Sequence, residues 1–255
     1  MGKSKRSAVR ALEHMVAAGW EVSAVVAPEP DPSAADAQRL DLAADRIGLP
    51  RVSDDDLYAG IDRLGEVDLV VSFLFWRRIR GPLIRLPRLG CLNFHPAPLP
   101  DMRGVGGYNV AILEGWSEWG VSSHYVDEDF DTGDLVQVDR FPIDPAKETA
   151  LSLDLKSQEI LLANFRSVTD GLLRGAQLPR TAQGDGRYVT RDEMEDLRRV
   201  RPDDGPALLE RRIRAFWYPP HEGATLEVAG QTVTLVDRRR LEETAAALRA
   251  AGIFP

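Results

Sequence analysis

The first third of the chain alternates between apolar residues at helical spacing and near-continuous apolar runs. Residues 5–18 place apolar side chains on one helical face, and Gly19 follows as the expected end of that helix. Residues 21–27 are rich in β-branched side chains and end at Pro28, which predicts a buried strand. Residues 67–75 form a near-continuous apolar run, typical of a parallel strand covered on both faces. Helical stretches, one of them at 34–47, separate the two strands.

Shorter elements follow, with more loop between them. The pattern predicts a strand at 91–96, a short helix at 108–114, strands at 120–126 and 134–141, and a long helix at 148–173. The C-terminal part predicts helices at 190–200 and 205–216, a hairpin at 224–236 that turns at Ala229 and Gly230, and a last helix at 241–251. The sequence contains no internal repeat and no low-complexity tract.

This order of elements predicts an α/β fold. We expect a Rossmann-like, mostly parallel sheet with helices on both faces over residues 1–180, and a small α+β appendage over residues 181–255. Folds of this type normally open with a strand, whereas this chain runs from MGKSK directly into its first helix. The first strand is therefore expected to be absent: either it is missing from the sequence given, or the sheet is built without it. Losing a central strand would leave backbone groups of the neighbouring strands unpaired.

Composition narrows the classes of partner. The chain has 255 residues and a formal net charge of −8, which disfavours attraction to a nucleic acid backbone. The loop at 28–36 is acidic and rich in proline, and no apolar run approaches the roughly 20 residues that span a bilayer. Cys91 is the single cysteine, so no internal disulfide can form. Without a signal-like N-terminus, we expect a cytoplasmic enzyme with no nucleic acid or membrane partner.

The strongest candidate chemistry lies between residues 91 and 134. Asn93 and His95 alternate at the end of a predicted strand, so their side chains project to the same side. Open parallel sheets bind ligands at the carboxyl ends of their strands, which is where this strand enters a loop. The acidic stretch at 126–134 follows another strand and could bring Asp131 to the imidazole. Taken alone, each residue is also compatible with an ordinary loop or turn.

Two strings together resemble a known family. LNFHPAPLPDMRG, followed by DEDFDTGD, is similar to the paired signature of the folate-dependent formyltransferases. YVTRDEMEDL and IRAFWYPPHEGATLEV resemble the C-terminal parts of the branch that modifies amino sugars. The resemblance implies a catalytic triad of Asn93, His95 and Asp131 and the co-substrate 10-formyltetrahydrofolate, with no metal ion.

The implied reaction gives each of the three side chains a role. Attack of an amine on the formyl carbon builds negative charge on oxygen and requires removal of a proton from nitrogen. Asn93 and His95 can donate hydrogen bonds to that oxygen, and donors of this kind are worth roughly 10²–10³ in rate each. Asp131 would orient or charge-stabilise the imidazole. The sequence does not distinguish whether His95 or Asp131 takes the amine proton.

The resemblance also implies where the substrates bind. It places the pterin between the strand at 67–75 and the loop before Asp131, and the residues concerned are Phe73, Leu74, Phe75, Val126, Asp127, Glu128 and Phe130. Arg103 and Gly104 match the Arg-Gly turn of the family, where the arginine either positions the loop or meets an anionic group of the substrate. Phe73 and Phe75 have an ordinary alternative as core aromatics.

The C-terminal resemblance favours the primary amine of a nucleotide sugar as the acceptor, in a protein that can form a homodimer. An amino acid or antibiotic amine is an alternative acceptor. Other readings of the whole chain are a formyltetrahydrofolate hydrolase, a methionyl-tRNA-type formyltransferase, and a non-catalytic folate- or sugar-binding module. The aromatic segment at 216–220 is expected to pack as a hinge, and the arginine run at 238–240 to begin a solvated helix.

Overall fold

The computed structural model describes residues 1–29 and 34–250, which fall into two compact units. The first unit holds residues 1–103, 120–141 and 156–187, and the second holds 104–119, 142–155 and the residues from 188 onward. Neither unit is continuous in sequence, and the predicted boundary near residue 180 stays a prediction. Residues 30–33 of the predicted acidic loop and residue 251 of the predicted last helix lie outside the described residues.

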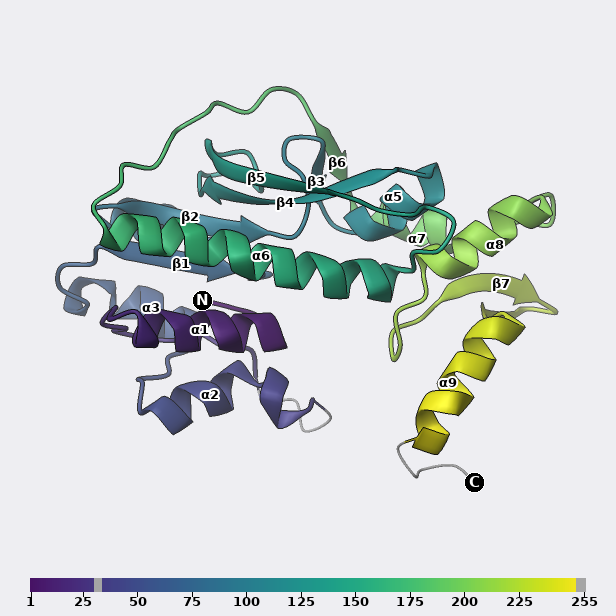
Figure 1. Ribbon diagram of the computed structural model, residues 1–255, viewed down its shortest axis with the longest axis horizontal. Helices are drawn as coiled ribbons and strands as arrows, with labels where there is room; N and C mark the ends of the chain where they lie inside the picture. Colours follow the sequence, from purple (N-terminus) through teal and green to yellow (C-terminus); the bar gives the residue numbers. More distant parts are fainter. Residues whose placement is uncertain (30–33, 251–255) are drawn as a thin grey trace. The chain divides into compact units, whose positions relative to one another are not determined.

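A four-stranded sheet with the order β1-β2-β4-β5 lies mainly in the first unit (Figure 1). Its strands are β1 (Leu69–Phe73), β2 (Gly90–His95), β4 (Glu118–Tyr125) and β5 (Leu135–Pro142). β1 and β2 run parallel, and β4 joins β2 in the antiparallel sense. The predicted α/β class with parallel strands is confirmed, and β4 makes the sheet mixed.

Helices cover both faces of β1 and β2 in the first unit. The aromatic rings of Phe73 and Phe94 point to one face, where they pack against Phe165 of α6 (Ala150–Leu173) and the apolar side of α1 (Arg6–Ala17). Val70 and Cys91 point to the other face, against α3 (Asp54–Ala59) and α4 (Gly81–Arg85). The alternation of neighbouring strand residues between two apolar clusters explains the near-continuous apolar runs in the sequence.

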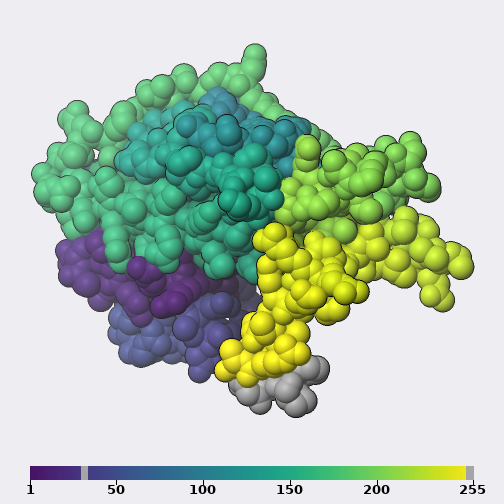
Figure 2. Space-filling view, turned by 45° about the vertical axis from the view of Figure 1, so that its right-hand side comes forward, coloured from purple at the N-terminus to yellow at the C-terminus, as the bar shows by residue number. Residues whose placement is uncertain are grey.

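Helix α1 also makes polar contacts with α6 at the surface. In the space-filling view, the purple surface of α1 adjoins the green surface of α6 (Figure 2). Arg10 pairs with Glu159 at 2.7 Å, and His14 Nε2 lies 2.7 Å from the Asp170 carboxylate. On its other side, α1 packs against α2 (Leu40–Ile47) through Val9, Leu40, Ala43 and Ala44.

The predicted strand at 21–27 is wrong as a regular strand. In the described part of that segment, only Val25 makes a bridge, to Arg51. The residues Met1–Lys3 are extended instead and join β1 through a bridge between Gly2 and Phe73. A strand needs a partner along its edge to form a ladder, and a cavity lies beside most of this segment. Across residues 1–29 and 34–68 the structure has no strand.

The second unit contains short helices and a hairpin. Its helices are α5 (Gly107–Glu114), α7 (Arg191–Arg198), α8 (Pro206–Ala215) and α9 (Arg238–Ala250), and its hairpin joins β7 (Ala224–Val228) to β8 (Gln231–Leu235). Ala229 and Gly230 both have positive φ, at 50° and 77°, as two-residue hairpin turns require. The hairpin predicted from the sequence is therefore confirmed. The sequence did not predict α4 or the short paired strands β3 (Met102–Gly104) and β6 (Arg187–Val189).

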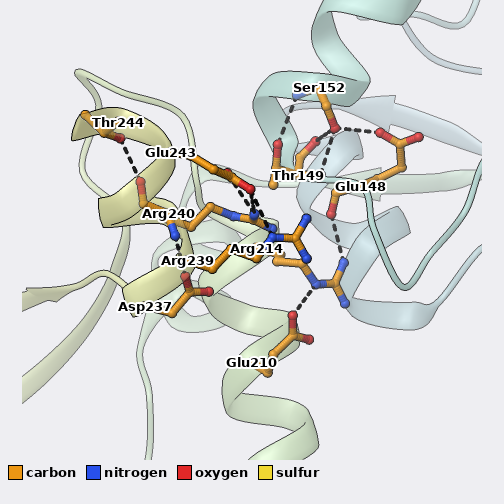
Figure 3. Close-up of polar contacts among 10 residues, drawn as sticks. All are labelled: Glu148, Thr149, Ser152, Glu210, Arg214, Asp237, Arg239, Arg240, Glu243 and Thr244. Carbon is orange, nitrogen blue, oxygen red and sulfur yellow. Dashed lines mark hydrogen bonds and ion pairs between the residues drawn. The ribbon is translucent and has the colours of Figure 1, made fainter. Parts of the chain in front are cut away.

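Buried arginines organise this second unit (Figure 3). Arg214 of α8 is 3% exposed and donates to the carbonyl oxygens of Pro145 and Glu148 and to the carboxylate of Glu210. It thereby satisfies carbonyl groups just before α6, where Thr149 caps the helix. The predicted solvated arginine run does begin a helix, α9, but Arg240 is 2% exposed and pairs with Glu243.

No helix in the described residues is both long and apolar enough to cross a membrane.

Candidate active site

The structure brings the three predicted catalytic side chains together within the first unit. Asn93 and His95 lie at the carboxyl end of β2, and Asp131 lies in the loop between β4 and β5. His95 Nδ1 is 3.6 Å from Asp131 Oδ1, and both side chains are about nine-tenths buried. The prediction that Asp131 reaches the imidazole is consistent with this distance, although the pair is too far apart for a direct hydrogen bond.

Two residues that the sequence did not single out fix the orientation of Asn93. Ser72 Oγ of β1 donates to Asn93 Oδ1 at 2.7 Å, and Asn93 Nδ2 lies 3.0 Å from Nε2 of His124 on β4. His124 Nδ1 lies 2.7 Å from the carbonyl oxygen of Tyr125, which can only accept. Nδ1 must therefore carry the ring hydrogen, and Nε2 accepts from Asn93. This chain of hydrogen bonds assigns the oxygen and nitrogen of the Asn93 carboxamide.

The turn that carries Asp131 has an unusual backbone. Asp131 has φ of 58°, in the left-handed region that costs energy for a residue with a Cβ atom. Gly133 has no room for a side chain, since a Cβ atom there would lie 2.0 Å from the carbonyl oxygen of Tyr125. Thr132 Oγ1 donates to Asp127 Oδ1 at 2.7 Å and closes the start of the turn. The aspartate-threonine-glycine string is therefore a structural requirement as well as a motif.

Gln183 clamps this turn from a distant part of the sequence. Its Nε2 donates to the carbonyl oxygens of Asp131 at 3.1 Å and Gly133 at 2.6 Å. Arg103 in turn donates to Gln183 Oε1 from Nη2 at 3.0 Å and to the carbonyl oxygen of Gly184 at 2.9 Å. Of the two uses expected for Arg103, the structure therefore shows the positioning of a loop.

The electrostatics of His95 follow from its burial. Desolvation lowers the pKa of His95 below its ordinary value, because a charged imidazolium would lose its hydration. The nearby Asp131 carboxylate opposes this shift and raises the pKa, as does the backbone of Met102, while His124 lowers it further. His95 Nε2 is buried and has no hydrogen-bond partner among the described residues. A neutral ring with one unsatisfied nitrogen is suited to accept a proton, but His95 itself does not line the cavity that adjoins Asn93 and Asp131.

A cavity of about 50 Å³ adjoins the carboxamide and the aspartate. The predicted pterin residues Phe75, Val126, Asp127 and Phe130 line it, together with Ser72, Asn93, His124 and Asp131. Phe73 does not line it, because its ring is 3% exposed and stacks in the core with Phe94. Leu74 and Glu128 do not line it either, and Glu128 is held at the surface by Arg78 and Arg85.

Gly104 belongs to the second unit, where its role is one of close packing. It has φ of 82°, and a Cβ atom would lie 2.4 Å from the carbonyl oxygen of Val189. The structure therefore gives this glycine a reason that does not involve a substrate. Among the described residues, no group of three or more His, Cys, Asp or Glu side chains could hold a metal ion.

The sequence is similar to those of known formyltransferases. A family model described as formyl transferase matches residues 33–161. The chain is 31% identical to a methionyl-tRNA formyltransferase of Bordetella bronchiseptica over 240 residues, 86% of this chain and 75% of the relative. It is 31% identical to a GDP-perosamine N-formyltransferase of Brucella melitensis over 165 residues, 64% of this chain and 62% of the relative.

Solved structures share the fold. An N-formyltransferase from Helicobacter canadensis, in complex with folinic acid and dTDP-3-aminofucose, superposes with a TM-score of 0.73 at 19% identity, covering 90% of this chain and 83% of that chain. A 4-N formyltransferase from Francisella tularensis also gives a TM-score of 0.73, at 16% identity, covering 92% and 95%. At these identities the likeness shows the fold.

Proposed function

The chain belongs to the formyl transferase family, and from this premise we propose that it moves the formyl group of 10-formyltetrahydrofolate to the primary amine of a nucleotide-linked amino sugar. Formyl transfer from a folate-type donor to an amine is the activity of this enzyme class. The observation that carries the proposal is the convergence of Asn93, His95 and Asp131 around a neutral, buried imidazole.

Asn93 and His95 have different roles at the formyl group: Asn93 stabilises the oxyanion, and His95 accepts the amine proton. As the amine attacks, the second amide hydrogen of Asn93, which the contacts with Ser72 and His124 leave available, donates to the developing oxyanion. His95 Nε2 accepts the amine proton, and the resulting imidazolium is stabilised by the Asp131 carboxylate. The bond between the formyl carbon and N10 of the folate then breaks, and N10 takes the proton. The products are the N-formyl amine and tetrahydrofolate, so atoms and charge balance.

We place the folate donor beside this group of side chains. Phe75, Val126 and Phe130 supply apolar contacts for a flat pterin ring, and the acidic residues Asp127 and Asp129 can accept from its amino groups. Phe130 is 46% exposed, so much of its ring is open to a ligand. We include Phe75 and Phe130 in the donor site and leave Phe73 in the core.

The choice of a sugar acceptor rests on charge and on relatives. A net charge of −8 disfavours a polyanionic acceptor such as transfer RNA, because binding to a phosphate backbone depends on clustered positive charge. The solved Helicobacter canadensis neighbour binds a nucleotide-linked amino sugar, and a Brucella relative is named for one. The match to methionyl-tRNA formyltransferases makes transfer RNA the second candidate acceptor.

The test is to incubate the purified protein with 10-formyltetrahydrofolate and separate acceptors: dTDP- and GDP-linked 3-amino and 4-amino sugars, methionyl-tRNA, and buffer alone. Tetrahydrofolate release and the formylated amine are both measured. We expect release that depends on an amino sugar. Release in buffer alone would indicate a hydrolase, and release with methionyl-tRNA only would reject the sugar.

Matched histidine variants show whether the activity belongs to this site. His95→Ala should abolish turnover. His14→Ala also removes a histidine beside a carboxylate, that of Asp170, but outside the site, and it should leave turnover unchanged. Substantial activity in His95→Ala would remove the imidazole from the mechanism.

A further inference from the structure

A cavity of about 420 Å³ lies beside the amino-terminal half of β1, within the first unit. Residues 66–71 form one of its walls and residues 20–26 form another. None of Asn93, His95 and Asp131 lines it. Open α/β sheets bind their ligands at the carboxyl ends of the strands, so a cavity at the other end of β1 is not part of the candidate active site.

The cavity has apolar cover above and below the plane of the sheet. Ala8 and Ala11 of α1 and Phe165 of α6 line it and belong to the cluster that covers one face of β1. Leu57, Leu64, Leu83 and Leu86 also line it and belong to the cluster over the other face, or pack against it. A strand placed here would be buried on both faces, and strands in that position are apolar throughout.

The width of the slot is that of one strand, because Met1–Lys3 already bridges it at one end. On one side, Gly2 N donates to the carbonyl oxygen of Val26 at 3.0 Å. On the other side, Phe73 N donates to the carbonyl oxygen of Met1 at 2.9 Å, and Lys3 N donates to that of Phe73 at 3.3 Å. From this bridged end, the cavity continues along β1 toward the amino-terminal end of that strand.

The pairing also sets direction and register. Gly2 and Phe73 form a parallel bridge, and the Met1 amine donates to the carbonyl oxygen of Val71 at 2.7 Å. In a parallel ladder, every second residue of a strand bonds to the same neighbour. The backbone N–H and C=O groups of Val71 and Leu69 therefore point into the slot, as those of Phe73 do. Residues added before Met1 in the same register would form hydrogen bonds first with Val71 and then with Leu69.

The burial of the Met1 amino group also favours an occupant joined to its nitrogen. It is buried, and burial lowers its pKa to about 6, since the charged ammonium is poorly solvated there. A peptide bond at this nitrogen would keep the donor to Val71 and would remove the buried ionisable group.

We propose that this cavity is an acceptor slot for one extended apolar segment of roughly five residues, joined to the nitrogen of Met1 and running parallel to β1. The segment completes the sheet between β1 and residues 20–26. It converts the lone bridge at Val25 into part of a continuous ladder. The ligand of the slot is thus a β-strand, rich in Val and Ile, with no charged side chain inside it.

The test compares the protein as it stands with N-terminal extensions of equal length. The first extension has about five Val and Ile residues before Met1, the second has Gly and Ser only, and the third repeats the first with a central Pro. The apolar extension should raise Tm by at least about 5 °C, since about 1 kcal/mol corresponds to 2–4 °C for a chain of this size. It should also slow hydrogen exchange at the amides of Val71 and Leu69.

The other two extensions serve as controls. The Gly-Ser version should leave Tm and exchange as in the parent chain, and the central Pro should remove most of the gain because it cannot donate to a ladder. Equal Tm values and unprotected amides in all three would overturn the proposal. A stable dimer of the apolar version in size-exclusion chromatography would also overturn it, because the strand would then serve a neighbouring copy. None of these outcomes depends on formyl transfer.

Discussion

At the scale of single residues, burial sets the protonation state of His95. The pKa of this histidine is lowered below 6.5 by loss of hydration, against the opposing effect of Asp131. We therefore expect a neutral ring at neutral pH and an acidic limb of kcat/KM that lies below pH 6.5. An NMR titration of the His95 imidazole measures its pKa, and the pH–rate profile of the same protein measures the acidic limb of kcat/KM.

The variant Asp131→Asn separates the two causes of this shift. It removes the negative charge beside the ring while leaving the ring buried, so the pKa of His95 should fall further. The same titration would reject this account if the pKa of His95 rose in the variant.

Gln183 holds Asp131 in place and does not line the cavity beside Asn93. Gln183→Leu would leave the carbonyl oxygens of Asp131 and Gly133 without their donor, at a cost of about 1–3 kcal/mol in stability. A displacement of this turn should lower kcat by roughly 10- to 100-fold, because small errors in catalytic geometry are costly. The KM for the folate should change less. Steady-state kinetics and urea denaturation measure these effects.

A second glutamine in the same unit provides the matched control. Gln137 donates from Nε2 to both carboxylate oxygens of Asp139, at 2.9 and 2.8 Å, and does not contact the Asp131 turn. Gln137→Leu should therefore lower stability and keep kcat. Similar kcat values in the two variants would show that Gln183 has a structural role only.

Part of this site is readable in the sequence. The alternation of Asn93 and His95 at a strand end and the resemblance around Asp131 were enough to propose the triad, and the structure brings the three together. Ser72 carries a weaker signal, as a polar residue inside an apolar strand. Gln183 carries none, because it reaches the turn from 52 positions away and only the folded chain shows that contact.

At the scale of elements, the turn after β4 depends on the small size of Gly133. A Cβ atom at this position would lie 2.0 Å from the carbonyl oxygen of Tyr125, which is backbone and has little freedom to move. Gly133→Ala should therefore shift the turn, displace Asp131 and destabilise the protein by about 1–3 kcal/mol. The Tm of thermal unfolding and the kcat are both expected to fall.

Gly184→Ala is the control for this substitution. A Cβ atom at Gly184 would have no heavy atom within 4 Å, and this residue has no positive φ to maintain. Its Tm and kcat should match those of the parent protein. If Gly133→Ala behaves in the same way, the turn is more adaptable than its contacts indicate.

Helices and strands were predicted correctly where the apolar periodicity of the sequence agrees with the pairing that the fold allows. The helix at 148–173 and the hairpin at 224–236 have strong local patterns, and both form with nearly those bounds. The segment at 21–27 has an equally strong strand composition, yet a ladder also requires a neighbouring strand along its length. β3 and β6 were missed because three-residue strands carry too little periodicity to be recognised.

At the scale of the whole molecule, two buried ionisable groups should shape stability against pH. Burial lowers the pKa of the Met1 amine to about 6 from 8.0 and raises that of the Cys91 thiol to about 12 from 9.0. Between pH 6 and 8 the unfolded chain binds a proton at Met1 that the folded chain does not, so the free energy of unfolding rises with pH by about 2–3 kcal/mol. Above pH 9 the unfolded thiol loses its proton first, so stability falls.

Urea denaturation from pH 5.5 to 10 measures this curve, and we expect a maximum at pH 8–9 from these two groups. Cys91→Ala should remove the alkaline fall, and the apolar N-terminal extension should remove the rise because it converts the amine into a peptide nitrogen. Burial of His95 changes the free energy of unfolding mainly at pH values below 6.5, because its pKa is lowered from that value. The change in stability between pH 7 and 8 therefore reports mainly on the Met1 amine. A flat curve over that interval would mean that the amine is hydrated in the folded protein, and the slot beside β1 would then be open to water along its whole length.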